Sequence, residues 1–227
     1  MTASAERPDT TLLVIAKQPV PGRVKTRLVP PFTHEQAAAL AEAALADTLH
    51  ITLMAPARRR LLVLDGKPGA WLPHGFDIVP QCGGTLDERL ADAFAAVHGP
   101  ALLIGMDTPQ ITPDLLTVDW QAADAVFGPA ADGGFWALGL RVPDPALLRG
   151  VPMSTQSTGA IQRARLLTAG LRVVDLPLLR DVDTAVNAVA VARQAPRSRF
   201  AARVREFAAI VRPTYGVTGD GTLGETA

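Results

Sequence analysis

The sequence predicts an α/β fold: an open, mostly parallel sheet with helices on both faces. Short apolar runs of strand length alternate along the chain with longer segments whose apolar residues recur at helical spacing. One run, residues 101–106, is apolar throughout, which is typical of a central strand in a parallel sheet. We expect a single domain at residues 11–212, between a disordered N-terminus at residues 1–10 and a flexible tail at residues 213–227.

Capping residues help to place the helices. Thr33 is the expected N-cap of the first helix, with Gln36 at the capping-box position, and Thr85 and Thr112 open the next two. Gly170 closes a later helix. The expected strands cover residues 11–16, 60–64, 76–79, 101–106, 125–127, 135–140 and 171–175; the expected helices cover residues 33–54, 85–97, 113–123, 159–169, 184–194 and 199–211.

Composition narrows the class of protein. The 22 basic and 22 acidic residues cancel, whereas a general nucleic-acid binder usually has a basic excess, so we expect no nucleic-acid partner. No apolar run reaches the roughly 20 residues that cross a bilayer, and we expect no membrane span. The first ten residues are too polar for a signal peptide, and the single cysteine, Cys82, excludes an internal disulfide. These features predict a cytoplasmic protein and leave its oligomeric state open.

The loop after the first strand is rich in cations. It places four of them within eleven residues. Ligands of open α/β sheets bind at the carboxyl ends of the strands, where cations and free N–H groups pair with phosphate oxygens. The loop is not a Walker A motif, because Val24 rather than glycine precedes Lys25. A solvated surface loop is the alternative to a phosphate site. The nucleotide-binding residues that we predict here are Ala16, Lys17, Gly22, Arg23, Lys25 and Arg27.

Two acidic segments predict a metal site. Asp107 follows the apolar strand at 101–106, where a carboxylate has little structural purpose. Asp181 and Asp183 are two residues apart, so in an extended segment both face the same side. Magnesium prefers such oxygen ligands, and we expect Mg²⁺ (or Mn²⁺) to be bound by all three. The alternative is that Asp183 only caps the next helix while Asp181 is exposed.

Two further segments are candidates for binding the acceptor. The first comprises Asp132, Gly133 and Gly134, and it could be a plain β-turn or a close approach of the backbone to the acceptor. The second supplies Ser154, Thr155 and Ser157 at a helix N-terminus. Hydroxyls and free N–H groups there suit a phosphate or carboxylate but also serve simple capping.

Over residues 11–195 these segments, in order, resemble a bacterial family labelled as a GT-A-type glycosyltransferase or radical-SAM-associated transferase. They are also similar, less closely, to the 2-phospholactate guanylyltransferases, which share an Ala-Lys-Thr/Ser-Arg-Leu core and an Asp-x-Asp-Thr element. Those enzymes have a Gly-Thr-Asn element in place of the Asp-Gly-Gly at residues 132–134, so the resemblance does not extend to their substrate.

The resemblance implies a nucleotide-diphospho-sugar transferase fold, which is GT-A-like and Rossmann-type. It also implies that Lys25 and Arg27 hold a triphosphate and that Asp107, within Gly-x-Asp-x-Pro, binds metal. A glutamine followed by Gly-Thr reads the base edge in similar nucleotidyltransferases. The matching residues here are Gln81, Gly84 and Thr85.

The prediction is therefore a magnesium-dependent transferase with Lys25, Arg27 and Asp107 as catalytic residues. We favour nucleotidyl transfer from a nucleoside triphosphate to a phosphorylated small molecule, with release of pyrophosphate. Glycosyl transfer from a nucleotide sugar is the alternative, and a non-catalytic nucleotide-binding module is the third. Whether one or two metal ions are bound stays open, as do the base and the acceptor.

Overall fold

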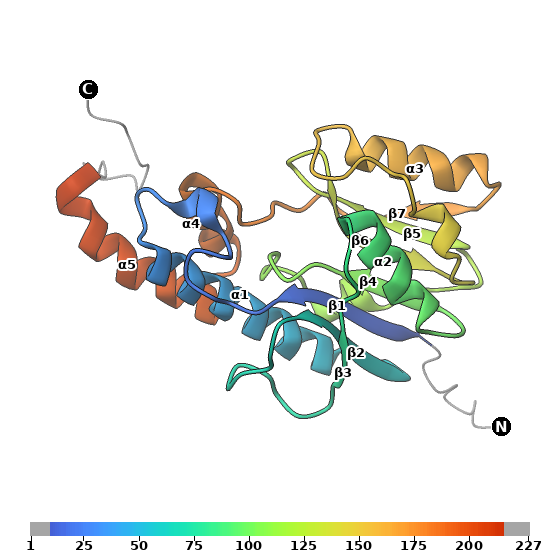
Figure 1. Cartoon of the computed structure of the whole chain (residues 1–227), viewed down its shortest axis with the longest axis horizontal. Helices are drawn as coiled ribbons and strands as arrows, with labels where there is room; N and C mark the ends of the chain where they lie inside the picture. Colours follow the sequence, from blue (N-terminus) through green and yellow to red (C-terminus); the bar gives the residue numbers. More distant parts are fainter. Residues whose placement is uncertain (1–9, 216–227) are drawn as a thin grey trace.

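The computed structural model describes residues 10–215 of the chain (Figure 1). Its centre is a seven-stranded sheet with the strand order β3-β2-β1-β4-β6-β5-β7. Only β6 runs antiparallel to its neighbours, β4 and β5, and the other pairs are parallel, which confirms the predicted fold class. The strands are β1 (Thr11–Lys17), β2 (Arg59–Asp65), β3 (Asp77–Pro80), β4 (Ala101–Ile104), β5 (Ala125–Pro129), β6 (Phe135–Leu140) and β7 (Val173–Asp175).

Helices cover both faces of this sheet (Figure 1). Alternate residues of a strand point to opposite faces, so Leu12 joins the cluster beneath α1 while Leu13 joins the cluster beneath α2 and α3. Phe94 of α2 is fully buried in this second cluster. The helices are α1 (His34–Met54), α2 (Leu86–Ala95), α3 (Thr158–Thr168), α4 (Ala185–Gln194) and α5 (Arg199–Tyr215), with short 3₁₀ turns at Thr26–Leu28, Pro113–Leu116 and Pro145–Leu147.

The first helix, α1, is apolar on two sides. Leu45 and Leu49 face the sheet, while Leu40 packs with α4 and α5 on the other side. Asp47 of α1, itself buried, accepts a hydrogen bond from the backbone N–H of Phe200 at 2.8 Å and so caps the start of α5. Because α1 is covered twice, it needs apolar residues on both sides.

This double burial also explains an unexpected property of α1. By length and composition alone, His34–Met54 could cross a membrane, although the sequence analysis found no uninterrupted apolar run of that length. In the structure, 61% of its most apolar window is buried inside the protein, as in the core helix of a globular domain. The property is therefore weak evidence for a membrane span.

Most expected elements are present. Thr33 and Gln36 form the predicted capping box, with Gln36 N–H donating to Thr33 Oγ1 at 3.2 Å and Thr33 N–H donating to Gln36 Oε1 at 2.9 Å. The strand expected at residues 101–106 ends at Ile104, and the N–H of Gly105 still donates to the carbonyl of Trp136 at 3.1 Å, next to the pairing of Ile104 with Ala137. Helix α5 continues through residues 213–215, which the sequence analysis placed in the tail; residues 1–9 and 216–227 lie outside the described residues.

The helix expected at residues 113–123 was a wrong prediction. Only the 3₁₀ turn Pro113–Leu116 forms, and the side chain of Thr112 makes no capping bond. The side chain of Asp119 accepts the N–H of Gln121 at 2.9 Å in a local turn that competes with a helix. Trp120 donates through Nε1 to the hydroxyl of Thr10 at 2.7 Å, a contact that holds this segment against the start of β1.

Candidate metal and nucleotide site

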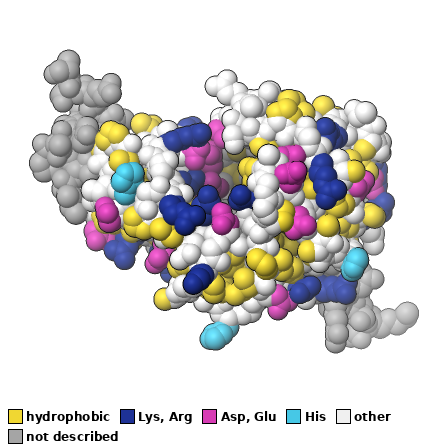
Figure 2. Space-filling view, viewed as in Figure 1, with side chains coloured by type: hydrophobic (Ala, Val, Ile, Leu, Met, Phe, Trp, Pro, Cys, Tyr) yellow, Lys and Arg dark blue, Asp and Glu magenta, His cyan; other side chains and the backbone are white. Residues whose placement is uncertain are grey.

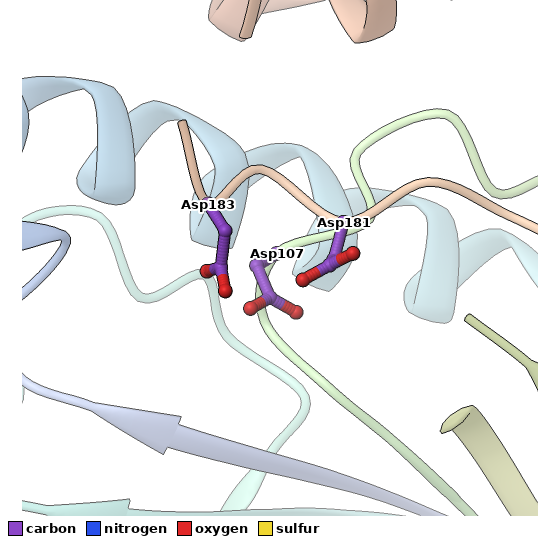
Figure 3. A group of neighbouring side chains, drawn as sticks. All are labelled: Asp107, Asp181 and Asp183. Carbon is purple, nitrogen blue, oxygen red and sulfur yellow. The ribbon is translucent and has the colours of Figure 1, made fainter. Parts of the chain in front are cut away.

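Three aspartates meet at the carboxyl ends of the central strands (Figure 3). Asp107 follows β4, and Asp181 and Asp183 precede α4. One carboxylate oxygen from each lies within 4.8 Å of the others. Val182, between the two later aspartates, is buried in the core, so its neighbours both face the opposite side, as the spacing predicted. A backbone hydrogen bond from Val182 N–H to Asp107 O at 3.0 Å joins the two segments.

Two cations of the first loop reach into this cluster. Lys25 Nζ lies 2.7 Å from Asp107 Oδ2 and 2.9 Å from Asp183 Oδ1, and Arg27 Nη1 lies 3.0 Å from Asp183 Oδ2. Burial alone would lower the pKa of Lys25, but the charges of Asp107 and Asp183 outweigh it and raise the pKa above its ordinary value. Lys25 is therefore a permanent cation, and it neutralises part of the cluster.

Asp181 differs from its neighbours because no lysine or arginine among residues 10–215 pairs with it. It is buried, and its Oδ1 has no hydrogen-bond partner within residues 10–215. Burial first, and then the charges of Asp107, Asp132 and Asp183, raise its pKa to about 6. Burial also acts on Asp183, but the cations Lys25 and Arg27 hold the pKa of Asp183 below its ordinary value.

The donor set fits a hard divalent cation. A buried carboxylate oxygen without a partner costs free energy unless a proton or a cation satisfies it. Asp181 Oδ1 is such an oxygen, and the carboxylates of Asp107 and Asp183 lie beside it. Magnesium and manganese both accept all-oxygen sites of this kind.

Two cavities meet at the aspartates, where acidic and basic side chains gather around a hollow (Figure 2). The first, of about 400 Å³, lies over the strand ends and is walled by α2 and by the segments before β6 and α3. The second, of about 270 Å³, is formed mainly by the first loop. Asp107 and Asp183 line both, so a ligand at the cluster can extend into either cavity.

Most of the predicted site residues line these cavities. The first cavity contains Ala16, Lys17, Gln81, Asp107, Asp132, Gly134, Ser154, Thr155, Asp181 and Asp183. The second contains Lys17, Arg23, Lys25, Arg27, Asp107 and Asp183. The predicted residues that line neither cavity are Gly22, Gly84, Thr85, Gly133 and Ser157.

Local geometry explains the roles of Thr85 and Gly133, which line neither cavity. Thr85 N–H donates to Glu88 Oε2 at 2.8 Å, which fits the helix-capping alternative. Gly133 has φ +91°, and a Cβ there would collide with the carbonyl oxygen of Gln156. The Asp-Gly-Gly turn therefore packs its backbone tightly against the segment that begins α3, and only glycine permits this.

Gln81 lies in the first cavity with its amide group already engaged. Its Nε2 donates to the carbonyls of Ala16 at 2.7 Å and Val63 at 3.1 Å, at the ends of β1 and β2. Its Oε1 lies 3.4 Å from Arg89 Nη1. Contact between Gln81 and a base stays a prediction. Because Nε2 already donates to two backbone carbonyls, only the side-chain oxygen Oε1 could contact a base in this geometry.

A comparison with protein families identifies the family of this chain. The family described as "Uncharacterized protein conserved in bacteria (DUF2064)" matches residues 39–155, just over half of the chain. The chain belongs to this family. A comparison with curated proteins gave no match.

Solved structures share the fold. The chain is 27% identical to a "putative nucleotide-diphospho-sugar transferase" from Desulfovibrio desulfuricans G20, with a TM-score of 0.81, over 91% of this chain and 98% of that one. It is 20% identical to Rv0371c from Mycobacterium tuberculosis H37Rv, with a TM-score of 0.53, over 82% of this chain and 99% of that one. The nucleotide-diphospho-sugar transferase fold is thus confirmed, whereas the link to guanylyltransferases stays a prediction.

Sequence reasoning missed Arg89, which lines the first cavity, and Asp65, which pairs with it. Asp65, the last residue of β2, lies 3.7 Å from Lys17 Nζ and 3.4 Å from Arg89 Nη1. The rule that identified Asp107, a carboxylate at the carboxyl end of an apolar strand, applies equally to Asp65. Arg89 is one helical turn after Thr85 in α2, and that spacing could have marked it.

Proposed function

We propose that this protein is a divalent-metal-dependent transferase that uses a nucleotide, and that it transfers a nucleotidyl group from a nucleoside triphosphate and releases pyrophosphate. The observation that carries the proposal is the second cavity. It places Lys17, Arg23, Lys25 and Arg27 directly beside the aspartate cluster. A triphosphate bound at a metal there would extend its outer phosphates into this cavity.

The charges of the cluster support the same conclusion. The three aspartates carry three negative charges, and Lys25 and Arg27 contribute two positive charges. The cluster with its two cations is therefore one charge negative, and a divalent cation would make it one charge positive. Such a site binds a phosphate only together with the metal, as a metal–triphosphate substrate requires.

The chain's own residues would act mainly by positioning and by neutralising charge. Asp107, Asp181 and Asp183 would hold the metal, which when bound would neutralise charge on the phosphates. With a metal held by these carboxylates, Lys25, which now pairs with Asp107 and Asp183, would be available to a phosphate. Arg23 is exposed and makes no ion pair within residues 10–215, so it is available without any rearrangement.

Glycosyl transfer from a nucleotide sugar is the second candidate. The name of the Desulfovibrio desulfuricans relative favours it. The same aspartates would then hold a metal at the diphosphate, and the second cavity would contribute less because the donor has no third phosphate. The two reactions differ in their products, so product analysis separates them.

The experiment measures pyrophosphate from each of the four ribonucleoside triphosphates, and nucleoside diphosphate from a panel of nucleotide sugars, with and without Mg²⁺ or Mn²⁺. We expect pyrophosphate. Metal-dependent release of a nucleoside diphosphate from a nucleotide sugar would reject nucleotidyl transfer in favour of glycosyl transfer.

Calorimetry with variants tests the second cavity directly. Arg23→Ala should weaken triphosphate binding by about 1.5 kcal/mol, roughly tenfold, and leave monophosphate binding unchanged. Arg197→Ala, an exposed arginine that lines neither cavity, is the matched control. Equal triphosphate affinity in the Arg23 variant and the wild type would place the outer phosphates elsewhere.

A further inference from the structure

The first cavity has two chemically different ends. Among the described residues, its only lining cations are Lys17 and Arg89, and both pair with Asp65 at the end of β2. The other end is formed by residues 130–136, which lead into β6, and by residues 153–158. Two strands separate β2 from β6 in the sheet, so the two ends are about 14 Å apart. We call the end at residues 130–136 and 153–158 the acidic end.

The polar groups of the acidic end are ready to accept hydrogen bonds. Asp132 is exposed, its Oδ1 accepts the N–H of Gly134 at 2.8 Å, and it makes no ion pair in the part of the chain that the structure describes. The hydroxyl of Ser154 is likewise without a hydrogen bond among residues 10–215, and Ser154 has the unusual φ of +59°. Buried Asp181, proposed above as a metal ligand, borders the same end.

An apolar wall completes the acidic end. Phe135 and Met153, both partly buried against the cluster beneath α2 and α3, line it. This end of the cavity therefore combines an apolar surface with carboxylate and hydroxyl oxygens, and none of the described residues that line it is a lysine or arginine.

We propose that the acidic end binds an uncharged, hydroxyl-bearing acceptor, such as a sugar or polyol, whose hydroxyl donates to Asp132. Ionised carboxylates only accept hydrogen bonds, and a hydroxyl supplies the donor that Asp132 lacks. A phosphate would instead face the exposed carboxylate of Asp132 with no lysine or arginine among the described residues that line this end, and like charges at close range repel. The carbon skeleton of the acceptor lies on the apolar wall. This inference rests on the proposed function, and it replaces the phosphorylated acceptor that the sequence predicted.

The test uses matched pairs of acceptors that differ only by a phosphate: glycerol and glycerol 3-phosphate, ribose and ribose 5-phosphate, glucose and glucose 6-phosphate. Each is added to the full-length protein with Mg²⁺ and the panel of triphosphates and nucleotide sugars. Mass spectrometry follows the transfer product. We expect at least one uncharged acceptor to be used, at a rate at least tenfold above that of its phosphorylated partner.

The variant Asp132→Asn identifies the residue responsible. Asparagine keeps an oxygen that can accept the N–H of Gly134, so the turn is preserved while the charge is lost. The acceptor-dependent rate should fall at least tenfold, with unchanged nucleotide affinity by calorimetry. Asp119→Asn is the control, because Asp119 makes the same kind of turn, accepting from Gln121 N–H at 2.9 Å, outside the cavity.

Three results would overturn the inference: a phosphorylated acceptor used faster than its uncharged partner, an Asp132 variant as active as the wild type, or no rate above background with any uncharged acceptor. A failure of the proposed function itself is recognised separately, as the loss of metal-dependent nucleotide binding in the wild-type protein.

Discussion

Replacing Asp181 with asparagine should change the free energy of unfolding in opposite directions with and without a divalent metal. In the metal-free protein, the carboxylate of Asp181 is buried without a cation, and its pKa rises from 3.8 to about 6. Because its folded-state pKa is raised, the charged form destabilises the fold fully above pH 6 and not at all below 3.8. An asparagine at this position carries no charge, and its amide can donate to the neighbouring carboxylates.

The size of the effect follows from this pKa. A change from 3.8 to about 6 corresponds to roughly 3 kcal/mol at neutral pH. The cavity is open to solvent, which screens the charges, so we expect Asp181→Asn to raise the free energy of unfolding by about 1–2 kcal/mol. The gain should disappear as the pH falls from 6 to 3.8.

A divalent metal should make the wild type more stable than the Asp181→Asn variant. At a metal concentration 100 times the dissociation constant, the wild type gains about 2.7 kcal/mol, whereas the variant, which lacks a ligand, gains much less. Urea unfolding with and without MgCl₂ or MnCl₂ measures both effects, and Asp119→Asn controls for loss of a surface carboxylate. A variant that is less stable than the wild type without metal, or that keeps the full metal-dependent gain, would refute the reasoning.

Three further predictions concern other parts of the molecule. Lys25→Met removes the cation between two aspartates, so calorimetry should show tighter binding of metal alone but triphosphate binding weaker by about 1.5–3 kcal/mol; a change in the same direction for both would contradict the geometry. Gly133→Ala should lower the free energy of unfolding by about 1–3 kcal/mol more than Gly150→Ala, since both positions have positive φ but only the former Cβ meets backbone. Asp124→Asn should lower the melting temperature at neutral pH, because hydrogen bonds from Arg172 hold the pKa of Asp124 at about 2. This stabilising contribution is present above pH 3.8 and is lost as the pH falls to about 2, so a difference in melting temperature that persists at the lowest pH would show another cause.

Local sequence predicted most of the secondary structure because the signals are themselves local. The apolar run of β1 and the capping box at Thr33 need no distant contact to be recognised. The helix expected at residues 113–123 failed where a distant contact intervened, since Trp120 is held to Thr10, 110 residues away. Asp47 shows the same limit: its capping of α5 joins positions more than 150 residues apart.

For the candidate site, the sequence by itself determined which residue types stand at the carboxyl ends of the strands. Asp107 could be found from its place after an apolar run, and the alternation through Val182 placed Asp181 and Asp183 on one side of their segment. Both inferences use only the geometry of an extended chain, which a residue's immediate neighbours decide.

Only the tertiary structure decided how these groups share their charges. Lys25 pairs with residues 82 and 158 positions away, and nothing in its own loop distinguishes a lysine that binds aspartates from one that is free for phosphate. The same holds for Asp181, whose missing partner is visible only once the surrounding segments are in place. Strand ends far apart in sequence become neighbours through the order of the sheet, and electrostatic interactions depend on distance in space rather than along the chain.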